Sequence, residues 1–253
     1  MHHILILGGT TEASALAALL AQRGMAATLS YAGRTRHPRA QPVPVRVGGF
    51  GGVAGLVDYL RDAGITHLVD ATHPFAATMS ANAVLAAKQA GVPHIALTRP
   101  AWQAQEGDRW THVANVAGAV AALAGPAQRV LLALGRMHVV GFAARPQHHY
   151  LLRFVDAPDA PPPLPHYSLV VEGGPFTVAG DRALMAAHGI DLVISKNAGG
   201  SGAQAKLIAA RELGLPVVMI DRPALPERRE VHRPEAVLDW LDHDVDSGIE
   251  RGV

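Results

Sequence analysis

The sequence has no cysteine among its 253 residues and a formal net charge of only +1. Without cysteine the chain has no disulfides, no thiolate nucleophile and no cysteine-ligated metal or iron–sulfur site, and we expect a reducing, cytoplasmic setting. So small a net charge gives no broad basic field for nucleic acid or a lipid surface, and we expect neither partner. An anionic ligand must therefore meet individually placed arginine, lysine or histidine side chains.

Long apolar runs and metal-binding motifs are also missing. No apolar stretch is long enough to cross a bilayer, and the run at the N-terminus is too short for a signal peptide. The 14 histidines include no His-Glu-x-x-His motif, so no metal site is expected. With 49% hydrophobic and 17% charged residues, the composition is that of a folded globular chain.

Short β-rich runs alternate with alanine- and leucine-rich helical stretches along the whole chain. The pattern predicts strands over residues 4–7, 28–31, 43–47, 67–70, 94–98 and 129–134, with helices over 11–23, 53–63 and 79–90 among them. Such alternation is typical of an α/β fold in which helices flank parallel sheets.

Two segments, residues 86–101 and 209–224, resemble each other. Each runs from a helix through a Gly-x-Pro turn and a strand to an Arg-Pro pair. This turn is good helix-stop chemistry that could recur by chance. The interpretation we favour is two Rossmann-like lobes, residues 1–120 and 121–253, whose strand-end loops face a shared cleft that holds the active site.

The first expected strand ends in a glycine turn that leads into a helix. Its residues are Gly8, Gly9, Thr10, Thr11 and Glu12. Glycines let the backbone approach a pyrophosphate, and the free amides of a helix start can bind it. The turn departs from Gly-x-Gly-x-x-Gly, because Thr10 and Ala13 replace the later glycines. Alone, it is weak evidence for a dinucleotide site.

The end of the second strand distinguishes the two nicotinamide cofactors better. An NAD site offers an acid to the adenosine ribose here, whereas an NADP site offers cations to the 2′-phosphate. This sequence has Gly33, Arg34, Thr35 and Arg36, with no acid. The segment is either a solvated basic loop or a phosphate site, and its position favours the phosphate site and NADPH.

Two further loops are expected beside this cofactor. Gly49 and Gly51 belong to a run with four glycines in residues 48–52, which is either a flexible connector or a place where a ligand approaches the backbone. Thr72, His73 and Pro74 follow the strand at residues 67–70, where His73 is either a turn residue or a ligand contact.

Together these segments resemble the precorrin-6A reductase family of cobalamin biosynthesis, including its cobalt-precorrin-6A branch. The resemblance is carried by residues 4–13, 33–34, 48–52, 70–76, 99–102, 196–206 and 219–223. Among them, the run Asp70-Ala71-Thr72-His73-Pro74-Phe75-Ala76 is quite specific. The resemblance implies a two-lobed enzyme that uses NADPH to reduce one double bond of precorrin-6A, giving precorrin-6B. It covers both the metal-free and the cobalt-containing substrate, and it implies that other pathway enzymes could be partners in substrate hand-over.

A substrate with many carboxylates needs cations and backbone donors at the strand ends. The residues expected to bind it are Arg99, Arg136, Lys196, Asn197, Gly200, Ser201, Gly202, Lys206 and Arg222. His138 and Lys196 are the expected catalytic residues near the reacting ring. Because the cofactor carries the reactivity, a dedicated acid is optional.

Other functions fit the sequence less well. No tyrosine is followed four residues later by lysine, which disfavours a short-chain dehydrogenase, and Arg34 and Arg36 argue against a methyltransferase. A non-catalytic NADPH sensor and another NADPH-dependent reductase of an anionic substrate remain alternatives, because their binding residues would look the same.

Overall fold

The computed structural model describes residues 2–32 and 40–249, with side chains up to residue 243. The chain folds into two compact units. Lobe 1 comprises Met1–Arg99 and Ala224–Val253, and lobe 2 comprises Pro100–Pro223. Each holds a six-stranded sheet, and every strand pair in both sheets is parallel. The predicted fold class, two α/β lobes with parallel sheets flanked by helices, is confirmed.

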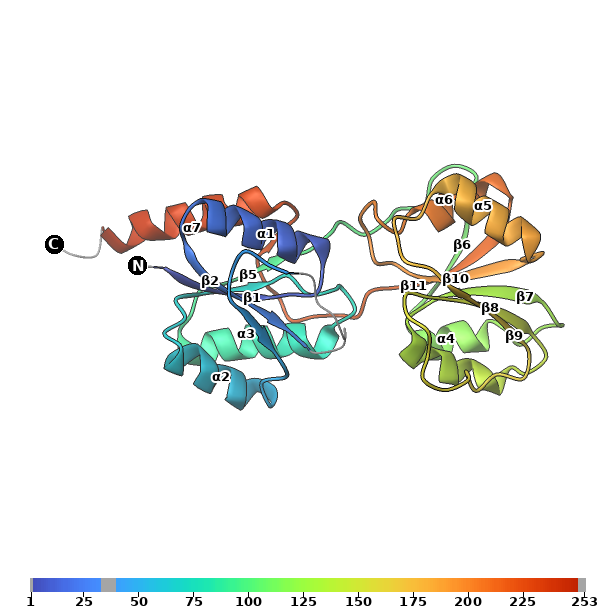
Figure 1. The fold of residues 1–253 in the computed structure, drawn as a ribbon, viewed down its shortest axis with the longest axis horizontal. Helices are drawn as coiled ribbons and strands as arrows, with labels where there is room; N and C mark the ends of the chain where they lie inside the picture. Colours follow the sequence, from blue (N-terminus) through green and yellow to red (C-terminus); the bar gives the residue numbers. More distant parts are fainter. Residues whose placement is uncertain (1, 33–39, 250–253) are drawn as a thin grey trace. The chain divides into compact units, whose positions relative to one another are not determined.

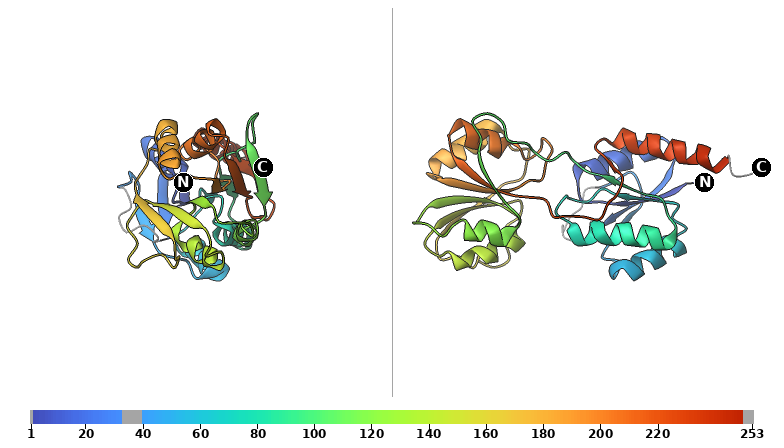
Figure 2. Two further views of the ribbon diagram at one scale, coloured as in Figure 1. Left: turned by 90° about the vertical axis from the view of Figure 1, so that its right-hand side faces the viewer. Right: turned by 180° about the vertical axis from the view of Figure 1, so that it is seen from behind.

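The sheet of lobe 1 has the order β12-β5-β4-β1-β2-β3. Its strands are β1 (His3–Leu7), β2 (Ala26–Tyr31), β3 (Val45–Val47), β4 (His67–Asp70), β5 (His94–Leu97) and β12 (Glu230–Val231). Its helices are α1 (Thr11–Gln22), α2 (Gly52–Asp62), α3 (Ala77–Ala90) and α7 (Pro234–Ile249). Figure 1 shows α1 and α7 on one face of this sheet and α2 and α3 on the other, and the reverse view in Figure 2 shows the same layers.

The two faces follow from the alternation of side chains along a strand. In β1, Ile4 and Ile6 pack in one core with α1 and α7. The alternate residues Leu5 and Leu7 pack in a second core with α2 and α3. Residues 4–7 of β1 are buried on both faces of the sheet, which explains why they form a continuous hydrophobic run.

The sheet of lobe 2 has the order β6-β11-β10-β7-β8-β9. Its strands are β6 (Arg109–Val113), β7 (Arg129–Ala133), β8 (His149–Phe154), β9 (Tyr167–Val171), β10 (Leu192–Lys196) and β11 (Pro216–Ile220). Helices α5 (Val178–Ala187) and α6 (Ala205–Glu212) cover one face, and α4 (Val116–Ala121) lies on the other (Figure 1). A 3₁₀ helix, η1 (Arg136–Ala144), follows β7 and packs against α4.

The lobe boundaries differ from the predicted division at residue 120. After β5 the chain crosses to lobe 2, where β6 pairs with β11; after β11 it returns, and β12 pairs with β5. Each crossover thus leads directly into an edge strand, β6 in lobe 2 and β12 in lobe 1, and α7 then packs on α1. The boundaries fall at the two Arg-Pro pairs that end the repeated segments, Arg99-Pro100 and Arg222-Pro223.

None of the helices in the described part of the chain is both long and apolar enough to cross a bilayer.

Candidate functional site

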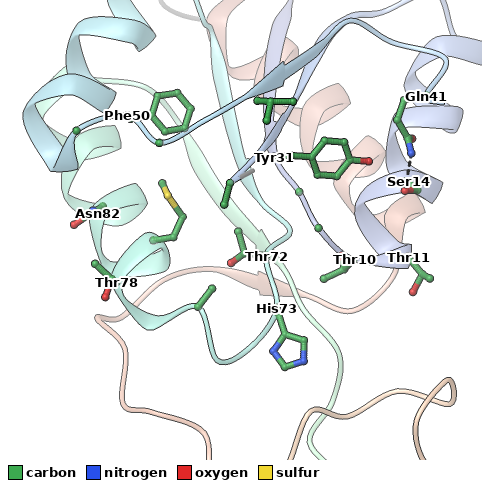
Figure 3. Close-up of a pocket in the computed structure, with 18 of the residues that line it drawn as sticks. Thr10, Thr11, Ser14, Tyr31, Gln41, Phe50, Thr72, His73, Thr78 and Asn82 are labelled. Atoms are coloured by element: carbon green, nitrogen blue, oxygen red, sulfur yellow. Dashed lines mark hydrogen bonds between the residues drawn. The ribbon is translucent and has the colours of Figure 1, made fainter. Parts of the chain in front are cut away.

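A pocket of about 1070 Å³ lies in lobe 1 where β1, β2, β3 and β4 end and α1, α2 and α3 begin (Figure 3). Ligands of parallel α/β sheets bind outside the carboxyl ends of the strands, and this volume is at the upper end for small-molecule sites. The predicted cofactor residues Gly8, Gly9, Thr10, Thr11, Gly49, Gly51, Thr72 and His73 all line it. The structure therefore gathers three separate segments of the sequence around one cavity.

The turn after β1 needs its two glycines. A Cβ atom on Gly8 would lie 2.5 Å from Leu29 Cδ1, and Gly9 has a φ of +122°, which side chains rarely adopt. Thr10 caps α1 by accepting a hydrogen bond from the amide of Ala13 at 3.1 Å, and its hydroxyl donates to the carbonyl of Ala71 at 2.8 Å. Thr10 thereby ties this turn to the loop after β4.

The loop after β4 is organised by buried Asp70. One carboxylate oxygen accepts hydrogen bonds from the amide of Thr72 (3.1 Å) and its hydroxyl (2.7 Å), and the other accepts one from Arg228 (2.8 Å). Both ion-pair partners are at least 94% buried. Asp70 thus orients Thr72, which faces the pocket, while Pro74 is buried and does not line it.

Glu12 and Arg99, which were predicted as a cofactor contact and a substrate contact, form an ion pair with each other. Arg99 donates to both carboxylate oxygens at 2.7 and 2.6 Å, and also to the hydroxyl of Thr11. Burial alone would raise the pKa of Glu12, but the hydrogen bonds and charge of Arg99 outweigh it and hold that pKa below its usual value. The ion pair therefore attaches Arg99, the last residue of lobe 1 before the chain crosses to lobe 2, to the first turn of α1.

Several pocket residues were not predicted from the sequence. They are Ser14, Tyr31, Gln41, Phe50, Thr78, Met79 and Asn82. Thr78 and Asn82 are four residues apart on α3, so they share the helix face next to the pocket (Figure 3). That polar spacing was the available signal. The predicted Gly33, Arg34, Thr35 and Arg36 lie outside the described residues.

In lobe 2, the two predicted catalytic residues come together. Lys196 ends β10 and His138 lies in η1, 58 residues apart in sequence, and Lys196 Nζ forms a 2.7 Å hydrogen bond with His138 Nε2. Both side chains are partly buried. The strands β7 and β10 are paired neighbours, so their carboxyl ends bring these groups together.

The glycine-rich segment after β10 is supported from inside lobe 2. Asn197 and Trp102 exchange two hydrogen bonds, from the amide of Trp102 (2.8 Å) and the side-chain amide of Asn197 (3.0 Å). The indole of Trp102 also donates to the carbonyl of Gly200 at 2.8 Å, and Arg222 donates to the carbonyl of Asn197 at 2.9 Å. The buried side chain of Asn197 therefore anchors the start of this segment to Trp102.

Lys206 was predicted to bind substrate directly, and its burial does not fit that role. Its side chain lies below the segment, where Nζ donates to the carbonyl of Ala203 at 2.6 Å and lies 5.0 Å from the ring of Trp102. Burial lowers the pKa of Lys206 to about 8. By contrast, Ser201 and Gly202 are exposed, as their predicted role requires.

The predicted Arg136 is exposed and lines a second pocket of about 270 Å³ in lobe 2, together with Met137, Phe154 and the proline-rich residues 158–163. No group of three or more His, Asp or Glu side chains that could hold a metal ion is found in the part of the chain that the structure describes.

Comparisons with known proteins agree with this two-lobed arrangement. The family model for precorrin-6x reductase CbiJ/CobK matches residues 3–242. A precorrin-6A reductase from Rhodobacter capsulatus is 59% identical over 244 residues, which are 96% of this chain and 97% of that protein. One from a Sinorhizobium species is 49% identical, covering 87% of this chain and 84% of its own.

A solved structure of CobK precorrin-6A reductase matches with a TM-score of 0.91 and 59% identity, covering 96% of this chain and 97% of that one. Fold, sequence and family model agree over nearly the whole length. The chain belongs to the precorrin-6x reductase CbiJ/CobK family.

Proposed function

We propose that the chain uses NADPH to reduce one double bond of metal-free precorrin-6A, giving precorrin-6B, in the cytoplasm. The observation that carries the proposal is the lobe 1 pocket, formed by a glycine turn and helix starts, in a member of a reductase family. Both relatives described above are named precorrin-6A reductases, without cobalt. Bound NADPH would supply the hydride.

The lobe 1 pocket fits a dinucleotide. Gly8 leaves no room for a side chain against Leu29, and Gly9 and the first turn of α1 offer backbone at the pocket wall. We assign Gly8, Gly9, Thr10 and Thr11 to the pyrophosphate, because a helix N-terminus favours negative charge. Arg34 and Arg36, which follow β2 in sequence, are assigned to the 2′-phosphate.

The carboxylates of the substrate are assigned to lobe 2. The amides of Gly199, Gly200, Ser201, Gly202 and Ala203 make no hydrogen bond among the described residues. From inside the lobe, Trp102 and Lys206 bind the carbonyls of Gly200 and Ala203, and Arg222 binds the carbonyls just before them. These contacts leave the amides of the segment to bind anions. Exposed Arg136 adds a guanidinium that can bind a carboxylate in bidentate fashion.

The proton is assigned to the His138–Lys196 pair. Reduction of a carbon–carbon double bond adds a hydride to one carbon and a proton to its neighbour. The 2.7 Å contact lets a proton pass between the lysine and the imidazole. One of the two groups can therefore donate its proton to the substrate and then take up a replacement proton from the other.

The test is an anaerobic assay that follows nicotinamide absorbance with metal-free and cobalt-containing precorrin-6A. We expect consumption of NADPH with the metal-free substrate and appearance of a product with two more hydrogens by mass. Binding of NADPH without turnover of either substrate would instead indicate a sensor.

The Arg34→Ala variant tests the choice of cofactor. Loss of a guanidinium from a phosphate should raise the KM for NADPH by roughly tenfold or more, since charged hydrogen bonds contribute about 1.5–3 kcal/mol. The KM for NADH should change little, because NADH lacks that phosphate. Equal effects on both cofactors would refute the assignment.

A further inference from the structure

Arg46 on β3 is hydrogen-bonded to residues 48–52, called here the glycine segment, which forms one wall of the lobe 1 pocket. Its NH1 donates to the carbonyl of Gly48 at 2.6 Å and to the hydroxyl of Ser30 at 3.3 Å, and its NH2 donates to the carbonyl of Gly49 at 2.8 Å. The guanidinium also lies 3.8 Å from the ring centre of Phe50. One side chain therefore joins the end of β2 to three successive residues of the segment.

These contacts determine which way the peptide units face. In a trans peptide, the carbonyl and the following amide point in opposite directions. Because Arg46 binds the carbonyls of Gly48 and Gly49, the amides of Gly49 and Phe50 point away from Arg46. Gly49 and Phe50 both line the pocket, and their amides donate to no acceptor among the described residues.

The glycine segment has backbone conformations that its own sequence does not favour over others. Gly48, Gly51 and Gly52 have φ values of +127°, +82° and +89°, and Gly51 caps α2 without a side-chain hydrogen bond. Four glycines leave this turn with little intrinsic preference, so fixing it costs chain entropy. The stacked Arg46 and Phe50, with Tyr59 5.2 Å from Phe50, supply the restraint.

A similar pair in lobe 2 differs in charge. There Arg153 lies 3.9 Å from the ring centre of Phe176, but it forms a buried ion pair with Asp181. Arg46 makes no ion pair in the described part of the chain; all its partners are neutral oxygens and rings. Within the described residues its positive charge has no carboxylate partner, so it favours an anionic ligand in the neighbouring pocket.

We propose that Arg46 is a positioning residue for the nicotinamide dinucleotide: it turns two carbonyls of the glycine segment away from the pocket and presents the amides of Gly49 and Phe50 to the ligand. The inference rests on the proposed function. Arg46 acts through the segment, since its donors are already bonded to Gly48, Gly49 and Ser30. It should therefore affect any dinucleotide that contacts this wall, with or without the 2′-phosphate.

The experiment measures the dissociation constants of NADPH and NADH by titration for the full-length wild type and for Arg46→Ala. We expect Arg46→Ala to weaken both cofactors by the same factor, about tenfold or more. In turnover assays the loss should fall on the KM for NADPH rather than on kcat. Arg61→Ala is the matched control, because Arg61 is an exposed arginine on α2 that donates a hydrogen bond to the carbonyl of Gln89, outside the pocket.

Arg46→Lys keeps the inference testable if the alanine variant does not fold. A lysine retains the charge but lacks the planar fork that reaches two carbonyls at once. We expect Arg46→Lys to raise the dissociation constants of both cofactors by the same factor, which should be smaller than the factor for Arg46→Ala.

Unchanged affinity in a folded Arg46 variant would overturn the inference. So would a loss confined to NADPH, which would make Arg46 a direct ligand of the 2′-phosphate. If the wild type itself bound neither cofactor, the proposed function would fail first, and the role of Arg46 with it.

Discussion

The two sheets are built alike, with β1 of lobe 1 and β7 of lobe 2 in equivalent central positions, but the lobes differ where these two strands end. In lobe 1, β1 leads through Gly8 and Gly9, with a φ of +122° at Gly9, into a regular α-helix. In lobe 2, β7 occupies the same place in its sheet but leads through Gly135, with an ordinary φ of −66°, into the 3₁₀ helix that carries His138. At equivalent strand ends, lobe 1 thus has a glycine turn with backbone at the pocket wall, whereas lobe 2 has the side chain of His138.

The charges follow the same division. The polar groups that line the lobe 1 pocket are mainly amides and hydroxyls. The nearby carboxylates of Glu12 and Asp70 are paired with arginines, and Arg46 is bonded to the carbonyls of Gly48 and Gly49. At the strand ends of lobe 2 lie Lys196, His138 and exposed Arg136. The proposed function assigns the cofactor to lobe 1 and the substrate to lobe 2, and variants in each lobe should then affect different steps.

The largest effect is expected from Lys196→Met in lobe 2. If Lys196 and His138 deliver the proton, kcat should fall by about 100-fold, a common size for the loss of general acid–base catalysis. The dissociation constant of NADPH should not change, because the variant leaves lobe 1 intact. Stopped-flow turnover and cofactor titration measure the two quantities.

A Lys196→Met, His138→Gln double variant sharpens this result. Groups that act as a unit give non-additive losses, so the double variant should be little slower than the slower single variant. Loss of NADPH affinity in step with kcat would contradict the division between the lobes.

A smaller effect is expected from the paired variants Gly9→Ala and Gly135→Ala. An alanine at the φ of Gly9 costs about 1–3 kcal/mol in strain, so NADPH should bind roughly ten- to a hundred-fold more weakly. Gly135 has an ordinary φ and open space at its Cβ position, so its variant should bind NADPH like the wild type. Equal effects from the two glycines would mean that the lobes do not differ as described.

The smallest effect concerns buried Lys206 and appears as a dependence of stability on pH. The pKa of Lys206 is lowered to about 8 from 10.5, so between these values the unfolded chain holds more protons than the folded one. The contribution of Lys206 to the free energy of unfolding therefore increases as pH rises from about 8 to 10. Relative to Lys206→Met, the wild type should become more stable from about pH 8 to pH 10.

Urea denaturation at several pH values measures this difference. Lys88→Met is the control, because Lys88 is exposed on α3, the helix of lobe 1 that corresponds to α6. A wild-type advantage that falls as pH rises would contradict the burial of Lys206.

Local sequence patterns predicted the elements well but not the exchange of edge strands. The strand at residues 67–70 was predicted with its observed bounds, and most other predicted elements differ by one or two residues at an end. The lobe boundary was wrong because pairing of β6 with β11, and of β12 with β5, joins segments more than 100 residues apart. No local periodicity reports such a pairing.

The site shows the same limit. Strand-end position led to the prediction that His138 and Lys196 lie near one reacting ring, and the structure shows them in contact. It also predicted the three loops that line the lobe 1 pocket. It could not separate residues that face a ligand from those that support a loop. Lys206 is buried and Arg99 is paired with Glu12 because of tertiary contacts with Trp102 and α1, which the sequence does not display.

A crystal structure of the protein with NADP⁺ tests the central claim most directly. We predict that the pyrophosphate lies against Gly8 to Thr11 at the start of α1, with the adenosine beside Tyr31 and the wall formed by Gly49 and Phe50. Adenosine bound in lobe 2, against η1 or the segment after β10, would contradict the account.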